Sequence, residues 1–315
     1  MSPTRRDLLR SATAAAAAMG LSSAAGAQET KGLGYVSQEG PDLLQPLFKI
    51  SLAEWSLHRA LKADEMKHLD FPVRARREFG IEAVEYVNTF FKDKAHDDGY
   101  LAELDKRCLD EGVKSLLIMC DGEGELSHAD KAERTKAVEN HYKWIDAAVR
   151  LHCHSIRVNA GAEGDRDEVA KRSAESLVEL ADYAKPHDLY VIVENHGGIS
   201  SDGAWLAGVL KLANHSHVGA LPDFGNFEIE PGRWYDRYEG VRELMPFARA
   251  VSAKTHDFDA EGECVETDYH RMLKIVVEAG YHGHLGIEYE GEVLSEPEGI
   301  RATKKLLERV RAGPR

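Results

Sequence analysis

The chain has few cysteines, and their spacing does not suggest a metal-binding or disulfide framework. Its 315 residues contain four of them, Cys108, Cys120, Cys153 and Cys264, and none belongs to a C-x-x-C pair. This spacing excludes a zinc finger. Their even number would permit disulfides in an oxidising compartment, but Cys120 and Cys153 lie in or beside apolar runs typical of strands. We therefore expect buried free thiols.

Basic residues are also scarce relative to acidic ones. The sequence has 40 Lys and Arg against 54 Asp and Glu, a formal net charge of −14 and a pI of about 5.5. A protein that follows nucleic-acid phosphates needs a basic face, and anionic membranes attract basic segments. The composition therefore argues against both as partners. Because 43% of the residues are hydrophobic, it also excludes intrinsic disorder.

The apolar stretch near the N-terminus, Ala12 to Leu21, is too short to cross a bilayer, which needs about 20 residues. It follows the paired arginines Arg5 and Arg6 and leads to the small residues Ala25-Gly26-Ala27. A basic start, a short apolar stretch and a small-residue cleavage site are typical of a twin-arginine export signal. We therefore predict a signal peptide over residues 1–27 and a soluble periplasmic product.

Beyond this segment, the chain alternates short β-type runs with longer helical patterns. Residues 28–48 are expected to form an irregular lead-in, and residues 49–312 contain eight strand–helix units. The expected strands are Ile50–Trp55, Ala83–Val87, Ser115–Cys120, Ser155–Asn159, Tyr190–Glu194, Val218–Pro222, Ala250–Thr255 and His284–Tyr289. Such alternation indicates a parallel sheet, and eight units suit a closed (β/α)8 TIM barrel. A doubly wound open sheet is the alternative, but no G-x-G-x-x-G follows the first strand.

Polar residues lie at the carboxyl ends of the last four predicted strands. Glu194, Asp223, His256 and Glu288 come from four successive strands. In a TIM barrel, the carboxyl ends of the strands meet at one mouth. Carboxylates that converge there repel one another unless a cation compensates their charge. Two glutamates, an aspartate and an imidazole suit Mn²⁺, Mg²⁺, Co²⁺ or Zn²⁺, so we predict one divalent metal ion, with Mn²⁺ favoured.

With these motifs, the sequence resembles the xylose-isomerase-like barrel superfamily of sugar isomerases and epimerases. The resemblance covers roughly residues 49–312 and rests on the motifs VENHGG, LPDFGN, KTHDFD and GIEYEG. It implies that Glu194, Asp223, His256 and Glu288 hold the metal. It also implies that Glu194 and Glu288 are the catalytic pair, which moves a proton through an enediolate on a sugar substrate.

Five further residues are candidates for substrate binding. Asn226 stands where the family often has a histidine, and it cannot act as an acid. Lys254 shares a strand face with His256, so it either anchors an oxyanion or neutralises the acidic ring. His196 shares a face with Glu194, and Arg157 and Asn159 end the fourth strand.

The predicted function is a divalent-metal-dependent sugar isomerase or epimerase acting on a free sugar or keto-sugar. Export disfavours sugar phosphates, which are mainly cytoplasmic metabolites. Three alternatives remain at this point. The first is a periplasmic lyase or hydratase acting on 3-keto-sugars or 3-keto-glycosides with the same metal site. The second is a non-catalytic sugar-binding barrel, and the third, a DNA-repair endonuclease, conflicts with the acidic charge. Homo-oligomer formation is left open.

Overall fold

The structure is a computed structural model that describes residues 46–312. The predicted export signal, residues 1–27, and most of the predicted lead-in, residues 28–48, lie outside the described residues. Within residues 46–312, no helix has both the length and the apolar character needed to cross a membrane.

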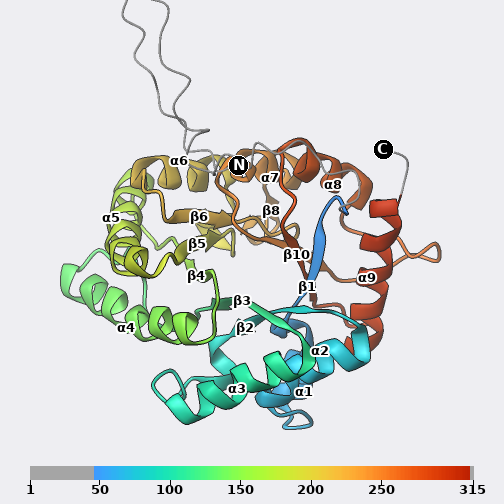
Figure 1. The fold of residues 1–315 in the computed structure, drawn as a ribbon. Coiled ribbons are helices and arrows are strands. Elements are labelled where there is room, and N and C mark those ends of the chain that lie inside the picture. The colour runs from blue at the N-terminus through green and yellow to red at the C-terminus, as the bar shows by residue number, and fades with distance from the viewer. Residues whose placement is uncertain (1–45, 313–315) are drawn as a thin grey trace, which may run out of the picture. The chain divides into compact units, whose positions relative to one another are not determined.

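Eight parallel strands form a sheet in the order β6-β5-β4-β3-β2-β1-β10-β9. They are β1 (Lys49–Ala53), β2 (Ala83–Val87), β3 (Lys114–Met119), β4 (Ser155–Asn159), β5 (Tyr190–Glu194), β6 (Val218–Leu221), β9 (Val251–Thr255) and β10 (His284–Tyr289). Parallel bridges Ala220–Ala248 and Asp223–Ser252 join the two ends of this sheet. The sheet therefore curls into a TIM-barrel-like ring, which Figure 1 shows enclosed by helices.

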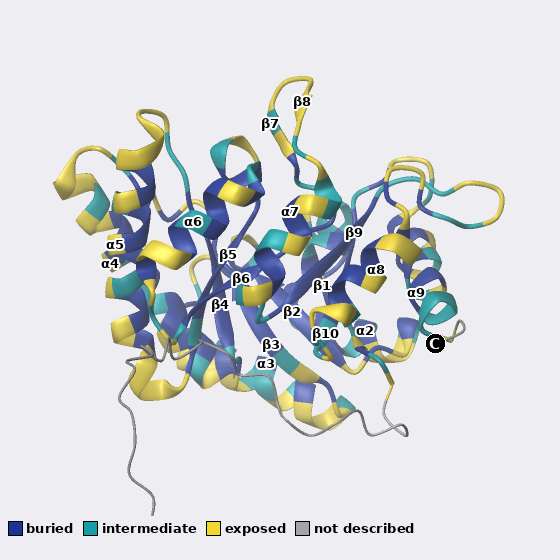
Figure 2. Ribbon diagram, turned by 90° about the horizontal axis from the view of Figure 1, so that it is seen from above, coloured by how far each residue is buried: buried dark blue, intermediate teal, exposed yellow. Residues whose placement is uncertain are grey.

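The observed strands match the eight predicted ones, with shifts of one or two residues at some ends. The largest difference is at β1, where Trp55 falls in a 3-10 turn, Glu54–Leu57, instead of ending the strand. The sequence pattern did not predict the small antiparallel hairpin formed by β7 (Glu228–Glu230) and β8 (Arg233–Trp234). Figure 2 shows this hairpin projecting beyond the barrel.

Helices follow the strands and cover the outside of the ring (Figure 1). They are α1 (His58–Lys62), α2 (Phe71–Phe79), α3 (Asp98–Glu111), α4 (Lys131–Arg150), α5 (Arg166–Ala184), α6 (Gly203–Ala213), α7 (Arg237–Leu244), α8 (Tyr269–Glu278) and α9 (Glu296–Ala312). In α5, for example, the sequence determines where the helix begins and which face is buried. The Asp165 carboxylate caps its first turn, and Val169, Leu177 and Leu180 lie on its buried face. α3 ends at Gly112, whose φ of +66° favours glycine.

The alternation of strand side chains divides the apolar core into two clusters. Residues such as Leu52, Tyr86 and Val193 point outward and pack against the helices in the larger cluster. Their strand neighbours Ala53 and Val87, with others of the same inner face, form a smaller cluster inside the ring. Apolar side chains thus fill part of the barrel interior, which also contains the buried Ser51 and Glu85. The four cysteines are buried and free, as expected.

Candidate active site at the carboxyl ends of the strands

Three buried carboxylates meet at the mouth of the barrel. Glu194 is the last residue of β5, Asp223 follows β6 by two residues, and Glu288 lies near the end of β10. One oxygen atom from each lies within 4.8 Å of the other two. β6 and β9 stand between β5 and β10 in the closed ring, so Glu194 and Glu288 approach the centre from two sides.

Each glutamate of this triad has a buried cation beside it. The Arg157 Nε, on β4, lies 2.8 Å from Oε2 of Glu194. Its N–H is not directed at that oxygen, so this contact is an ion pair without a hydrogen bond. On the other side, the Lys254 Nζ, on β9, lies 3.0 Å from Oε1 of Glu288. The two cations are 4% and 3% exposed, respectively, so water screens their charges little.

Asn226 links Glu194 on one side of the site to Lys254 on the other. Its side-chain amide donates to Oε1 of Glu194 at 3.1 Å, and its Oδ1 accepts from the Lys254 ammonium at 3.1 Å. The loop that carries it is held by Asp223, whose Oδ1 accepts the backbone N–H groups of Gly225 and Asn226. Asn226 therefore orients one glutamate and the lysine at once, a role for which an amide has both the donor and the acceptor.

Burial and neighbouring charges move the pKa values of these groups in different directions. Desolvation by burial raises the pKa of Glu194 well above its usual range, even though Arg157 opposes the shift. Burial would also raise the pKa of Glu288, but the charge and hydrogen bond of Lys254 outweigh it and lower that pKa. Burial opposes the charge of Lys254, yet the surrounding carboxylates raise its pKa, so the ammonium stays protonated.

The donor set at this mouth fits a divalent cation. The charged groups of the triad and its ion-pair partners are Asp121, Arg157, Glu194, Asp223, Lys254, Glu288 and Glu290. In this set, five carboxylates face two cations. The Oδ2 of Asp223 and the Oε2 of Glu194 are buried and accept no hydrogen bond in the described structure. A cation bound by Glu194, Asp223 and Glu288 would reduce this negative excess.

His256, the fourth predicted ligand, does not join the triad. β9 ends at Thr255, and the His256 side chain is 40% exposed, with its Nε2 3.8 Å from Glu290. The residue of β9 that pairs with Glu288 in the sheet register is Lys254. Strand alternation predicted both side chains on one face, but the chain leaves the barrel before His256 can point inward.

The remaining predicted residues lie around the same mouth. Asn159 donates from Nδ2 to Oδ1 of Asp121 at 2.8 Å, and Arg157 contacts the same oxygen at 2.7 Å. His196, just after β5, is exposed. Sequence reasoning missed Asp121 and Glu290. Asp121 follows an apolar strand just as the predicted ligands do, and Glu290 is two residues beyond Glu288, so the signals used for the last four strands would have found both.

A further buried carboxylate lies one layer deeper in the barrel. Glu85 of β2 accepts a hydrogen bond from Ser51 at 2.6 Å, and its other oxygen has no partner in the described structure. Its carboxylate fills the space beside Gly286, where an added Cβ would lie 2.5 Å from it. Gly286 precedes Glu288 by two residues on the same strand face. Burial raises the pKa of Glu85 to about 7.

This pKa predicts a pH dependence of stability. The unfolded chain ionises Glu85 near its ordinary pKa of 4.5, whereas the folded chain keeps it protonated up to a pKa of about 7. Glu85 therefore lowers stability as pH rises from 4.5 to 7, and its full cost persists above that. We expect the melting temperature of Glu85→Gln to fall less than that of the wild type between pH 5 and pH 8. Parallel melting curves for the two proteins would contradict this assignment.

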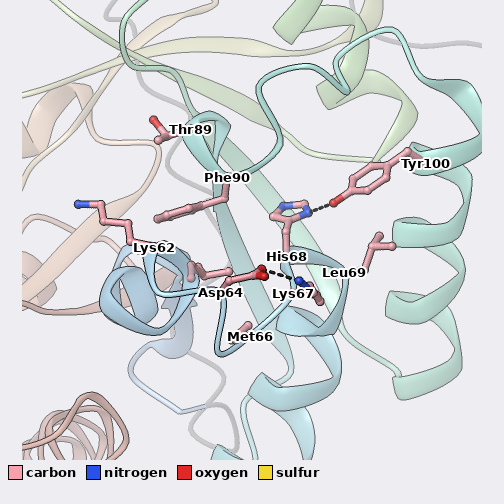
Figure 3. A pocket seen from close by; sticks show the side chains of 10 residues that line it. Lys62, Asp64, Met66, Lys67, His68, Leu69, Thr89, Phe90 and Tyr100 are labelled. Carbon is pink, nitrogen blue, oxygen red and sulfur yellow. Dashed lines mark hydrogen bonds and ion pairs between the residues drawn. The ribbon is translucent and has the colours of Figure 1, made fainter.

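A cavity of about 520 Å³ lies near the same end of the barrel but contains none of the triad. It is lined by the loops that follow β1 and β2, with Lys62, His68, Phe90 and Tyr100 among its side chains (Figure 3). The buried His68 holds the Tyr100 hydroxyl at 2.7 Å and stacks on Phe91. Because these contacts join the loop after β1 to the segment after β2, we interpret His68 as a packing residue of the barrel rim.

Comparison with known families agrees with the fold. The family profile described as xylose isomerase-like TIM barrel matches residues 73–310. The chain belongs to this family. Its eight described parallel strands and their curled sheet agree with such a barrel.

Solved structures share this fold at low sequence identity. A D-psicose 3-epimerase, crystallised in the presence of D-fructose, superposes with a TM-score of 0.65 at 14% identity, covering 84% of this chain and 100% of that one. The IOLI protein with a bound zinc atom superposes with a TM-score of 0.66 at 16% identity, and the match covers 84% of this chain and 98% of that one. A 3-keto-D-glucoside 4-epimerase from E. coli superposes with a TM-score of 0.60 at 15% identity, and the match covers 84% of this chain and 100% of that one. Among curated protein sequences, none matches the chain significantly.

Proposed function

We propose that this xylose isomerase-like barrel is a divalent-metal-dependent isomerase or epimerase of free sugars or keto-sugars. The observation that carries the proposal is the pair of buried glutamates, Glu194 and Glu288, which approach the centre of the mouth from two sides with Asp223 between them. Two carboxyl groups on opposite sides of a bound carbon can remove a proton from one face and return one to the other.

The proposed proton transfer uses the two glutamates in opposite states. The ionised one takes the proton from the carbon beside the substrate carbonyl, and the C–H electron pair forms a C=C bond as the carbonyl oxygen gains negative charge. The other, which carries a proton when substrate binds, donates it to the opposite face. A metal held by Glu194, Asp223 and Glu288 supplies polarisation of the carbonyl. Mn²⁺ is the ion we propose first, because all three ligands are carboxylates.

The predicted export of the chain favours a free sugar or keto-sugar over a sugar phosphate, and we include a periplasmic location in the proposal. Arg157, Asn159, Asn226 and His196 line the mouth and are proposed to contact substrate hydroxyl groups, since together they supply both donors and acceptors.

The experiment that tests this function is proton NMR in D2O with the Mn²⁺-loaded full chain. Free ketoses, their phosphates and 3-keto-glucosides are incubated separately. We expect deuterium to enter beside the carbonyl of a free sugar or keto-sugar, with the substrate's carbon skeleton retained. Loss of a β-substituent would instead show that the enzyme is a lyase, and uptake of water would show that it is a hydratase. If a loaded protein exchanges no proton of any substrate, the proposed chemistry is wrong.

A further inference from the structure

We propose that Lys254 is a catalytic residue of this site: its ammonium takes the place of a fourth metal ligand and binds the substrate oxygen that gains charge. This inference rests on the proposed function and deepens it. It also implies that the chain's own ligands to the divalent ion are three carboxylates, with an ammonium where the sequence predicted an imidazole.

The strand register places Lys254 within the ring of carboxylates. Lys254 pairs with Glu288 across β9 and β10. On the other side of β9, Ser252 bridges to Asp223, and strand alternation puts Lys254 on the same face as Ser252, one layer nearer the mouth. Lys254 therefore stands between Asp223 and Glu288, the position that His256 was expected to fill.

The loop after β6 leaves room for the lysine side chain. An added Cβ on Gly225 would lie 2.9 Å from Cδ and 3.0 Å from Cγ of Lys254. These distances are too short for a side chain at this position, so the loop can pass here only because residue 225 is a glycine. The lysine is thus built into the wall of the site. Its side chain is 3% exposed.

One of the three contacts of the Lys254 ammonium is weak enough for a substrate oxygen to replace it. The Lys254 Nζ is 3.0 Å from Oε1 of Glu288 and 3.1 Å from Oδ1 of Asn226. Its third contact, with Oε2 of Glu290, is longer at 3.4 Å, and the Glu290 side chain is 26% exposed. A substrate oxygen entering from the mouth would replace this weaker contact and accept the third N–H.

This placement defines what the lysine does in the reaction. As a glutamate takes the C–H proton, the carbonyl oxygen becomes an oxyanion, and the ammonium donates a hydrogen bond to it while keeping its own proton. A buried donor directed at developing charge is most valuable in the transition state. The same positive charge repels a divalent ion in the ring. Lys254 therefore weakens metal binding while it assists proton removal.

The metal part of this proposal can be tested without a substrate. Wild type, Lys254→His, Lys254→Met and the control Lys143→Met are titrated with Mn²⁺ by calorimetry, and their folding is checked by circular dichroism. The control also removes a lysine from a buried glutamate, since Lys143 lies 2.8 Å from Glu123 outside the ring. Lys254→His both removes the repulsion and adds a ligand, so we expect its affinity for Mn²⁺ to rise at least about 100-fold. The Mn²⁺ affinity of Lys254→Met should rise about 10-fold, because this variant loses the repulsion but adds no ligand. The Mn²⁺ affinity of Lys143→Met should equal that of the wild type.

The catalytic part uses the same variants in the deuterium-exchange assay at saturating Mn²⁺. We expect kcat of Lys254→Met to fall about 100- to 1000-fold with little change in KM, as for loss of an oxyanion donor. Lys254→Arg should retain part of the activity, because it keeps a charged donor, and Lys143→Met should be unaffected. A purely structural lysine would leave kcat unchanged in variants that are folded and metal-loaded.

The outcomes separate this inference from the proposed function. If the wild type exchanges substrate protons and folded Lys254→Met does so equally fast, the catalytic role of Lys254 is overturned while the function stands. If no protein exchanges any substrate, the proposed function fails and the catalytic role of Lys254 fails with it; the Mn²⁺ titrations still decide whether Lys254 occupies the ring. Unchanged Mn²⁺ affinity in folded Lys254→His overturns that placement. Loss of fold in both Lys254→His and Lys254→Met would also overturn the proposal, because it would make the lysine a folding residue.

Discussion

Replacing Glu288 or Glu194 by glutamine is expected to lower the rate of sugar interconversion by about 1000-fold or more, since each variant lacks one of the two proton-transferring carboxylates. Glutamine keeps the size of the side chain and an oxygen that can accept from Lys254 or Asn226. Each variant should still exchange the proton of one epimer, because the remaining glutamate faces that C–H bond. Deuterium incorporation into each epimer, followed by NMR, measures both effects.

The matched control for this prediction is Glu290→Gln. Glu290 lies two residues from Glu288 and 3.4 Å from the Lys254 ammonium, but it is not part of the buried triad. We expect its replacement to change the interconversion rate less than about 5-fold, as for a partly exposed charge that does not transfer the proton. Interconversion near the wild-type rate in both Glu194→Gln and Glu288→Gln would rule out the two-glutamate mechanism.

A second large effect is expected on stability when Arg157 is replaced by methionine. Arg157 pairs with Glu194 at 2.8 Å and with Asp121 at 2.7 Å, and its own side chain is 4% exposed. Methionine fills similar space but leaves the buried Glu194 without its cation. Removing one partner of a buried ion pair costs about 3–5 kcal/mol. For a barrel of this size, the melting temperature should fall by roughly 10 °C.

Arg107→Met provides the comparison at the surface. Arg107 also pairs with two acids, Glu103 and Asp70, but its side chain is 30% exposed and theirs are 44% and 55% exposed. Its loss should cost less than about 1 kcal/mol. Mn²⁺ should recover part of the stability of Arg157→Met, because a bound cation compensates the same carboxylate. A melting temperature of Arg157→Met as high as that of Arg107→Met would contradict the role given to this ion pair.

The strands and the carboxylates of the triad were readable from the sequence because both depend on local patterns. Apolar runs such as Tyr190–Glu194 and His284–Tyr289 form strands at the predicted residues. Acids that directly follow or end such runs then meet, since parallel strands in a closed barrel bring all their carboxyl ends to one mouth. The family resemblance agreed with this local pattern, and the family match confirms the barrel family.

Which residue of KTHDFD faces the triad was not readable in this way. Lys254 and His256 are two residues apart and share a face if the strand continues. The strand stops at Thr255, the predicted end, so His256 lies one residue beyond it, where strand alternation no longer fixes the direction of a side chain. The pairing of Lys254 with Glu288 and the space left by Gly225 are contacts between segments distant in sequence, so the linear pattern carried no signal for them.

The sequence by itself determined the barrel class, the positions of the strands, and the convergence of Glu194, Asp223 and Glu288, because periodicity and strand ends are properties of neighbouring residues. Only the tertiary structure decided what completes that ring and what neutralises it. Arg157, Lys254 and Asn226 are fixed on the triad by contacts across four strands, and Glu85 is buried beneath it. The electrostatics of the site depend on which charges share a desolvated space, and only the folded chain creates that space.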